Sequence, residues 1–428
     1  MKKTFKISNN LYARAIQTIP LATQTFSKSS MQWPLGASPM FFEKASGCNI
    51  YDVDGNKYID YLLALLPIIL GYKDKDVDEA VKKQINKGVI FSMSHPIEIE
   101  LAEKLKTIIP YAEMVRFGKN GSDVLSAAIR LARAYTKKDL VLVAGYHGWH
   151  DWFIGSTTRN AGVPKEVRKL TKTFRFNDID SVIYNINKFK NKIAAVVLEP
   201  DGIVPPDKTF LLELKKLCKK HGILIIFDEI VCGFRTSLGG ASEKFNVRPD
   251  LGCFGKSLGN GYPISAIVGK KNIMKLMKDV FVSGTYAGET LSMAASLATL
   301  NKLQKFNVPQ ELSKLGNKLK ITTNSILKDL ELIDIVEFSG NDWWPRLIVK
   351  NDKSSFLIHL IRQELIKNGI FMGSSFNLCL AHNNSIIFQR SIKKIEKSFL
   401  EVKNILGKKN PYNFLKGAKL KNIFSVRG

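Results

Sequence analysis

The sequence predicts an α/β fold, in which a large core of buried strands and crossover helices is flanked by segments from both ends of the chain. From about residue 115 to 300, short apolar runs alternate with loops and helix-length amphipathic segments, the pattern of parallel strands joined by helices. After about residue 310 the chain becomes lysine-rich and amphipathic, with few strands. Its 428 residues, at roughly 100–200 per domain, fit two or three structural units.

The elements ahead of the core are a short helix, a β-hairpin and two longer helices. Residues 40–62 alternate around Asp54-Gly55, a two-residue turn signal typical of hairpins. We expect the helices at Leu11–Ile19, Asp76–Lys87 and Ile97–Ile109. In the core we expect strands at Val141–Ala144, Ala194–Leu198 and Ile223–Phe227 and a helix at Phe210–Lys220, and a later strand at Pro345–Lys350.

Composition excludes several classes of protein. Hydrophobic residues make up 45% of the chain and charged residues 24%, which argues against disorder and collagen-like repetition. The longest apolar run, Tyr61–Tyr72, is shorter than the roughly 20 residues that a membrane helix needs. The five cysteines form no C-x-x-C pair, and no apolar stretch of a secretory signal follows the first residues. We therefore expect a reduced, cytoplasmic protein with no membrane partner.

The net charge of +26 raises the question of a nucleic-acid partner. Much of the excess lies at the ends, because residues 1–30 carry five Lys/Arg and no acidic residue, and residues 393–428 carry ten against two. The lysines are not interleaved with aromatic residues as in an RNA platform. We interpret the charge mainly as a solvated surface, with attraction of anionic substrates as the alternative, and expect no nucleic-acid partner.

The first segment that carries chemistry is Gly118–Tyr135, GKNGSDVLSAAIRLARAY. A Gly/Ser turn opens a helix here, and its free N–H groups with the Ser122 hydroxyl can hold an anion. The alternative is an ordinary helix start capped by Ser122 or Asp123.

Two further segments carry a carboxylate and a lysine. The apolar strand of Ile223–Arg235 ends in Asp228, at the strand end where ligands of parallel sheets collect. Lys256 lies in a glycine-rich apolar stretch, where burial lowers the pKa of an amine and makes it a nucleophile. The alternatives are an ion-paired structural aspartate and a snorkelling lysine. Taken together, an anion cradle, a strand-end aspartate and a buried lysine are the parts that hold pyridoxal phosphate (PLP).

The stretches FDEIVCGFR and FGKSLGNGYPISA resemble class III aminotransferases, within them the glutamate-1-semialdehyde aminomutase-like branch, and the resemblance runs from about Gly36 to His382. It implies the aspartate aminotransferase-like fold, PLP fold type I. A large domain at residues 66–308 would hold a mostly parallel seven-stranded sheet between helices. A smaller α+β domain would be built from residues 1–65 and 309–428, the latter with a basic tail.

The resemblance also implies roles for cofactor residues. Lys256 matches the Schiff-base lysine, and Asp228 the partner of the pyridine nitrogen. Ile230 would pack on one face of the ring, and Tyr146, in GYHGWH, would stack on the other. The remaining matches are Gly121 and Ser122 with the phosphate turn, and Thr285 with the threonine that reaches the phosphate of the neighbouring subunit of a homodimer.

Three acidic or basic side chains near these motifs leave alternatives open. His147 and His150 have helical spacing, but no further ligand spacing supports a metal site, and the turn that places Tyr146 explains them better. We therefore predict no metal. Glu199, at the end of the strand AAVVLEP, either orients neighbouring groups of the cofactor region or is a structural carboxylate.

The sequence departs from the family in two places. The residues before and after the phosphate turn are Lys119-Asn120 and Asp123, where the family has Asn-Ser and Glu. The aminomutase substrate pocket is also changed: its serine, arginine, tryptophan and glutamate fall at Thr25, Lys28, Leu65 and Asn377. An intact cofactor site with a rebuilt substrate wall predicts PLP chemistry on another substrate.

We therefore expect a PLP-dependent transaminase that passes an amino group from L-glutamate or a similar donor to an aldehyde or ketone, such as a sugar-like or anionic metabolite. The alternative enzyme is a 2,1-aminomutase of the glutamate-1-semialdehyde type. A binding or regulatory module of the same fold would lack the lysine, and Lys256 is present.

Overall fold

The computed structural model describes residues 3–350, 352, 355–418 and 420–421, which fall into two compact units. One unit is Lys75–Gln310. The other combines the described residues up to Asp74 with those from Glu311 onward. The domain boundaries expected from the sequence, at 65/66 and 308/309, stay predictions.

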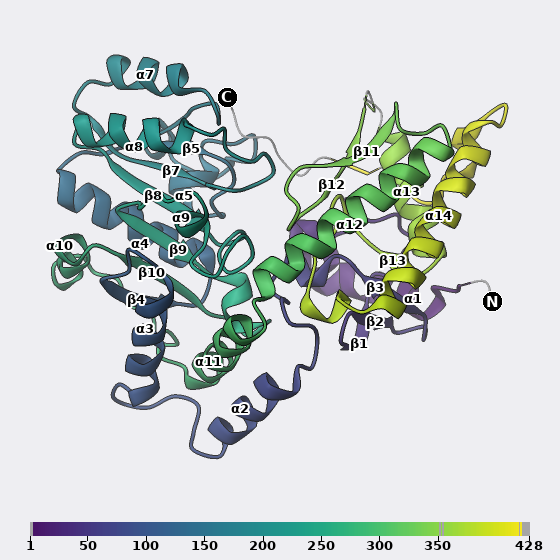
Figure 1. The fold of residues 1–428 in the computed structure, drawn as a ribbon, viewed down its shortest axis with the longest axis horizontal. Coiled ribbons are helices and arrows are strands. Elements are labelled where there is room, and N and C mark those ends of the chain that lie inside the picture. The colour runs from purple at the N-terminus through teal and green to yellow at the C-terminus, as the bar shows by residue number, and fades with distance from the viewer. Residues whose placement is uncertain (1–2, 351, 353–354, 419, 422–428) are drawn as a thin grey trace. The chain divides into compact units, whose positions relative to one another are not determined.

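The unit Lys75–Gln310 contains a seven-stranded sheet in the order β4-β10-β9-β8-β7-β5-β6 (Figure 1). Neighbouring strands from β9 to β6 pair in parallel, and β10 alone runs antiparallel to both of its neighbours. The mostly parallel seven-stranded sheet expected from the sequence is therefore confirmed. The strands are β4 (Met114–Gly118), β5 (Leu140–Ala144), β6 (Thr171–Thr173), β7 (Ile193–Leu198), β8 (Leu224–Glu229), β9 (Leu251–Phe254) and β10 (Ser265–Gly269).

The central strands are buried on both faces, which explains their unbroken apolar sequences. Every residue of β5, β7 and β8 is buried. One face packs on α4 (Gly121–Thr136), and the other on α7 (Ile179–Lys188) and α8 (Phe210–Lys220). Helices with apolar stripes on both sides of a sheet are what βαβ connections produce.

The other helices of this unit surround the sheet. They are α2 (Lys75–Ile85), α3 (Pro96–Ile108), α5 (Asp151–Ile154), α6 (Lys165–Lys169), α9 (Ala241–Lys244), the 3-10 turn η4 (Lys256–Gly259), α10 (Lys271–Met274), η5 (Lys275–Lys278) and α11 (Thr290–Lys305). The N-terminus of α12 (Val308–Asp329) also belongs to this unit, and its remainder to the other.

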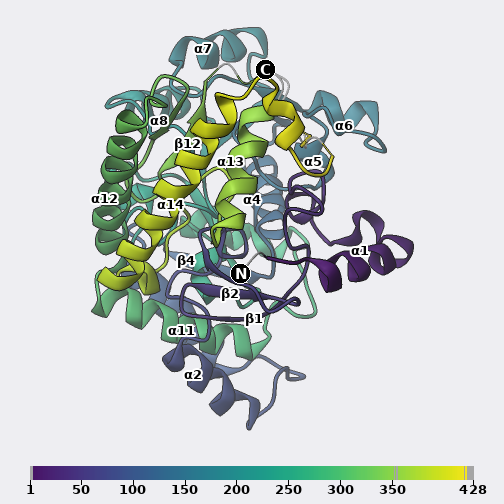
Figure 2. The same ribbon diagram turned by 90° about the vertical axis from the view of Figure 1, so that its right-hand side faces the viewer.

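The second unit contains a four-stranded sheet, β1-β2-β3-β13, and the hairpin β11–β12. Its strands are β1 (Phe42–Ser46), β2 (Asn49–Asp52), β3 (Lys57–Asp60), β11 (Val336–Ser339), β12 (Arg346–Val349) and β13 (Ile370–Phe371). Its helices are α1 (Lys6–Thr18), η1 (Pro20–Ala22), η2 (Phe26–Lys28), η3 (Leu63–Leu65), α13 (Phe356–Lys367), η6 (Leu380–His382), α14 (Ser385–Leu406) and η7 (Pro411–Phe414). Helices α13 and α14 contact each other and lie side by side (Figures 1 and 2).

Residues 40–62 form two hairpins where the sequence predicted one, because β1 pairs with β2 and β2 pairs with β3, and the predicted two-residue turn at Asp54-Gly55 is also wrong. The amide of Asp52 donates to the carbonyl of Asn56, so three residues form the loop between β2 and β3. The Asp52 carboxylate accepts from the amides of Asp54 and Asn56, and Gly55 takes the left-handed position at φ 81°. This side-chain bonding favours the longer loop.

The apolar run Tyr61–Tyr72 includes a turn of unusual backbone conformation. Leu63, Ala64, Leu65 and Leu66 all have positive φ, between 48° and 81°. Each non-glycine residue in that region costs on the order of 1 kcal/mol, so the fold must hold this turn. Among the described residues, no helix has the length and apolarity required to cross a membrane.

Candidate active site

The functional residues predicted from the sequence gather at one edge of the seven-stranded sheet. Strands β5, β7 and β8 are neighbours and run parallel, so their carboxyl ends meet. Asp228 is the penultimate residue of β8, Glu199 directly follows β7, and Tyr146 follows β5 by two residues. Ligands of open α/β sheets bind beyond this edge.

The three segments that carry the predicted cofactor residues all approach the side chain of Ile230. A Cβ added to Gly121, at the start of α4, would lie 3.1 Å from the Ile230 side chain. A Cβ added to Gly255, directly before Lys256, would lie 3.0 Å from the same side chain. The turn at the start of α4, the strand end at Asp228 and the lysine loop therefore meet at one apolar side chain.

The start of α4 has the donor set of an anion site. The Asp123 carboxylate caps the preceding turn, accepting from the amides of Lys119 (3.2 Å) and Asn120 (2.8 Å). The first helical amides, of Gly121 and Ser122, have no carbonyl partner within the helix. Of the two caps considered from the sequence, Asp123 caps the turn, and the Ser122 hydroxyl accepts from the amide of Trp149 at 3.4 Å.

The segment that carries Tyr146 closes over this turn. A Cβ on Gly148 would lie 2.3 Å from the Ser122 hydroxyl oxygen, and Gly148 has a φ of 93°, so only glycine fits. A Cβ on Gly145 would lie 3.3 Å from Glu199. Ser122, Tyr146 and Glu199 are thus in adjoining segments. Tyr146 keeps 44% of its surface exposed and meets Phe153 edge-on, with ring centroids 5.7 Å apart.

Asp228 has a partner that the sequence reasoning missed. Its Oδ2 lies 2.8 Å from His147 Nδ1, and its Oδ1 accepts from the amide of Ile230 at 3.1 Å. The other ring nitrogen of His147 lies 3.1 Å from the carbonyl of Ala144, and both groups of the Asp228–His147 pair are buried. These contacts give both ring nitrogens of His147 and both oxygens of Asp228 a hydrogen-bond partner, which a buried polar pair requires.

His147 and His150, whose helical spacing raised the possibility of a metal site, have separate hydrogen-bond partners. His150 Nδ1 lies 2.7 Å from the hydroxyl of Ser126, away from the Asp228 pair. The signal that could have identified His147 was its place directly after Tyr146, in the loop that follows a strand adjacent to β8.

Lys256 lies in a strained backbone position beside these carboxylates. It begins η4 with a φ of 40°, a region that L-residues rarely adopt. Burial lowers the pKa of its amine, and the carboxylates of Asp228 and Glu199 partly oppose that shift. Burial also raises the pKa of the Tyr146 phenol, and the same two carboxylates add to it. Asp228 and Glu199 therefore act electrostatically on both Lys256 and Tyr146.

Lys119, one of the residues that depart from the family pattern, forms a partly buried ion pair. Its Nζ lies 2.8 Å from Glu289 Oε2, and the two side chains are 19% and 14% exposed. Glu289 also caps α11, accepting from the amides of Leu291 and Ser292. Burial favours the protonated acid, but the bonds from Lys119 and Ser292 outweigh it and lower the pKa of Glu289. The pair ties the turn before α4 to the start of α11.

The remaining predicted residues lie apart from this cluster or in the other unit. Thr285 lies in an exposed loop between η5 and α11. Thr25 has a buried hydroxyl without a hydrogen-bond partner in the described part of the chain, and Lys28 is exposed. Leu65 lies in the left-handed turn, half-buried. The buried Asn377 amide accepts from Trp344 Nε1 (2.7 Å) and Ser375 Oγ (2.8 Å) and donates to the carbonyl of Leu62 (2.7 Å).

Comparison with known proteins decides the family. The model of the family "Aminotransferase class-III" matches residues 34–341. The chain belongs to this family. The class III chain is 34% identical to the 3-aminobutyryl-CoA aminotransferase of Cloacimonas acidaminovorans, over 93% of this chain and 98% of that protein. It is also 34% identical to the glutamate-1-semialdehyde 2,1-aminomutase of Hyperthermus butylicus, over 92% and 98%.

Solved structures agree with this assignment. The FumI protein of Sphingopyxis sp. MTA144, a PLP form, matches with a TM-score of 0.89 and 26% identity, over 95% of this chain and 99% of that one. A glutamate-1-semialdehyde aminomutase of Pseudomonas aeruginosa PAO1 has the same fold, with a TM-score of 0.83, 19% identity and coverage of 93% and 95%. The class III protein is therefore a PLP-dependent enzyme of fold type I.

The residues present fit this cofactor. The anion-binding start of α4, with the glycine-only approach of Gly148 to Ser122, suits a phosphate. The buried carboxyl group of Asp228, oriented by His147, suits a pyridine nitrogen, and the amine of Lys256 suits an aldehyde.

We expect Lys119→Met to loosen the cofactor and destabilise the fold. The substitution leaves Glu289 partly buried without its cation, which costs about 1–3 kcal/mol. Denaturant unfolding and titration of PLP into apoenzyme measure the two effects. Lys104, which is half-buried and bonds the neutral Gln304, provides the matched control Lys104→Met. The double variant Lys119→Met/Glu289→Gln should recover part of the loss, and identical behaviour of Lys119→Met and Lys104→Met would contradict the role.

Proposed function

We propose that this enzyme transfers an amino group from L-glutamate or a similar donor to a separate aldehyde or ketone acceptor of carbohydrate-like or anionic character. The observation that carries the proposal is Asn377. Its amide oxygen already accepts from Trp344 and Ser375, and so Asn377 offers the substrate neither the charge nor the free acceptor of the aminomutase glutamate.

The chain's own residues have these roles in the proposed reaction. When bound, PLP supplies an electron sink for the bonds of the substrate α-carbon. The amides of Gly121 and Ser122 hold the phosphate, and Tyr146 and Ile230 confine the ring. Asp228 would pair with the pyridine nitrogen of the bound cofactor, and His147 orients the Asp228 carboxyl group through its 2.8 Å contact.

Lys256 is the proposed base. Its Nζ takes the proton from the α-carbon and returns it later, which needs an amine that is neutral for part of the time. The lowered pKa caused by burial favours that neutral form. The left-handed φ fixes the direction in which the lysine side chain leaves the backbone.

The changed substrate residues favour transfer between molecules. An aminomutase must keep one small carboxylate-bearing molecule through two half-reactions, and an arginine fork holds a carboxylate at two points. Lys28 offers one point charge on an exposed, flexible stem. Leu65 stands where the aminomutase substrate pocket has a tryptophan, so a flat aromatic side chain is absent from that position. A 2,1-aminomutase stays the second candidate, because the relative from Hyperthermus butylicus carries that name.

We expect purified enzyme to transfer amino groups between separate donors and acceptors and to convert glutamate-1-semialdehyde poorly. A half-reaction screen, in which candidate amines are mixed with the holoenzyme and its cofactor absorbance is followed, identifies the donor. Robust formation of 5-aminolevulinate with no activity on donor–acceptor pairs would overturn this proposal in favour of the aminomutase.

We propose further that the enzyme is a homodimer, in which Thr285 reaches the cofactor phosphate of the partner. Large apolar side chains around Thr285 are exposed, among them Phe281 at 81% and Tyr286 at 65%. The carbonyls of Phe281 and Val282 accept from Arg130 and Arg116, which fixes this segment on its own unit. Sedimentation of the holoenzyme tests the assembly, and a monomer would contradict it.

The five cysteines are free and buried, which supports a cytoplasmic location.

A further inference from the structure

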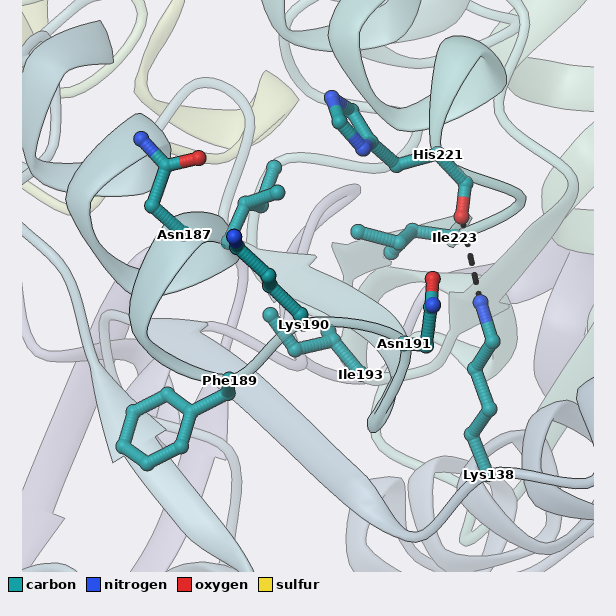
Figure 3. Close-up of a pocket in the computed structure, with 9 residues that line it drawn as sticks. Lys138, Asn187, Phe189, Lys190, Asn191, Ile193, His221 and Ile223 are labelled. Carbon is teal, nitrogen blue, oxygen red and sulfur yellow. Dashed lines mark hydrogen bonds between the residues drawn. The ribbon is translucent and has the colours of Figure 1, made fainter.

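A second binding site is indicated at the edge of the sheet opposite the catalytic residues. A cavity of about 200 Å³ opens where β5, β7 and β8 begin (Figure 3). Its polar lining comes from three connections: Lys138 before β5, Asn187, Lys190 and Asn191 before β7, and His221 before β8. Isoleucines at the strand starts and Phe189 supply its apolar lining.

The three connections bring together an unusual density of positive charge. Residues 137–139, 187–192 and 219–222 contain seven lysines, one histidine and a single acidic residue, Asp139. None of the residues that line the cavity is acidic. Like charges gathered on adjacent loops repel one another, so an anion bound among them would stabilise this edge.

Helix ends explain part of this charge. Helices α4, α7 and α8 all end here, and lysines in a last turn complement the helix dipole. Lys138 also has a structural role, because its Nζ donates to the carbonyls of His221 and Gly222, both at 3.1 Å. Lys190, by contrast, follows the end of α7, and its amine has no hydrogen bond or ion pair to any residue that the structure describes.

We propose that this cavity binds a small phosphate-bearing anion. Lys190 and the third N–H of Lys138 supply charged donors, and the amides of Asn187 and Asn191 supply neutral ones, so acceptors on several sides of one ligand can be satisfied. The volume is below the roughly 300–1,000 Å³ of sites for drug-sized molecules, which favours a small ligand over a polymer. The apolar lining would take an uncharged part of that ligand.

The test is calorimetric titration of holoenzyme with pyrophosphate, because bound PLP already fills the phosphate site at α4. We expect one pyrophosphate per chain, weaker binding at higher salt, and a loss of affinity of about tenfold or more in Lys190→Met. Lys83→Met, on the exposed side of α2, is the matched control and should bind as the unaltered enzyme does. Lys190 is not part of the catalytic site, so amino transfer should be unchanged in Lys190→Met.

Three outcomes would overturn the proposal. One is the absence of binding heat. Another is equal binding by Lys190→Met and Lys83→Met, which would indicate a general effect of surface charge. The third is binding of a short RNA that depends on Lys190 when pyrophosphate does not bind, which would indicate a nucleic-acid surface in place of a small-ligand site.

Discussion

Lys256→Ala is expected to abolish amino transfer while the protein still holds PLP non-covalently. The variant removes the buried amine that interacts electrostatically with Asp228 and Glu199, and with it the proposed base. The phosphate donors at α4 and the Asp228–His147 pair are untouched, so the cofactor retains its other anchors. Turnover assays and equilibrium dialysis of the cofactor measure the two effects.

Replacing Lys256 by alanine should remove the side chain without changing the backbone. Lys256 has a φ of 40°, and alanine is as disfavoured there as lysine, so the variant keeps the backbone strain and changes only the side chain. Borohydride reduction of the unaltered enzyme should label the peptide that contains Lys256. A label on any other peptide, or turnover by Lys256→Ala, would show that another lysine holds the cofactor.

Asp228→Asn is expected to keep PLP bound and to lose most of the rate. A neutral amide cannot hold the pyridine nitrogen protonated, so the charge that develops at the α-carbon is no longer stabilised. One charge-assisted hydrogen bond contributes about 1.5–3 kcal/mol in a ground state, and more where charge develops in a dry site. At about 1.4 kcal/mol per tenfold, the loss in kcat is at least tens of fold.

The Asp228–His147 bond allows an effect on the reaction rate to be separated from an effect on the fold. The asparagine oxygen can still accept a hydrogen bond from His147, so the fold should be retained while the carboxylate is lost. Single-turnover rates with a good amino donor, compared with Asp139→Asn at an exposed position, separate the effect from general loss of charge. Near-normal rates in Asp228→Asn would count decisively against the assigned role.

The strands of the core could be predicted because both faces of the sheet are buried. β5 and β7 are apolar throughout, β8 is apolar up to Phe227, and each apolar run is followed by polar or glycine residues, a pattern that the sequence alone shows. The same rule placed Asp228 at a ligand-binding edge. The helix Phe210–Lys220 was also predicted with its exact bounds, because its apolar positions recur at helical spacing.

Pairings between distant residues could not be predicted in this way. Lys119 and Glu289 are 170 residues apart, and neither has a local pattern that identifies the other. His147 was visible next to Tyr146, but its bond to Asp228 depends on the order of β5, β7 and β8 in the sheet. The turn at Asp54-Gly55 was assigned the wrong length, because the decisive contact is the bonding of the Asp52 side chain to the backbone.

The place of β4 at the edge of the sheet has a consequence during synthesis of the chain. β4 leads directly into the turn before α4, yet within the sheet it pairs only with β10. The carbonyl of Asn120 in that turn likewise accepts from the hydroxyl of Ser265, the first residue of β10. A nascent chain that has reached only α8 therefore lacks the strand that supports its phosphate turn. We therefore expect the growing protein to capture its vitamin-derived cofactor only after β10 has left the ribosome.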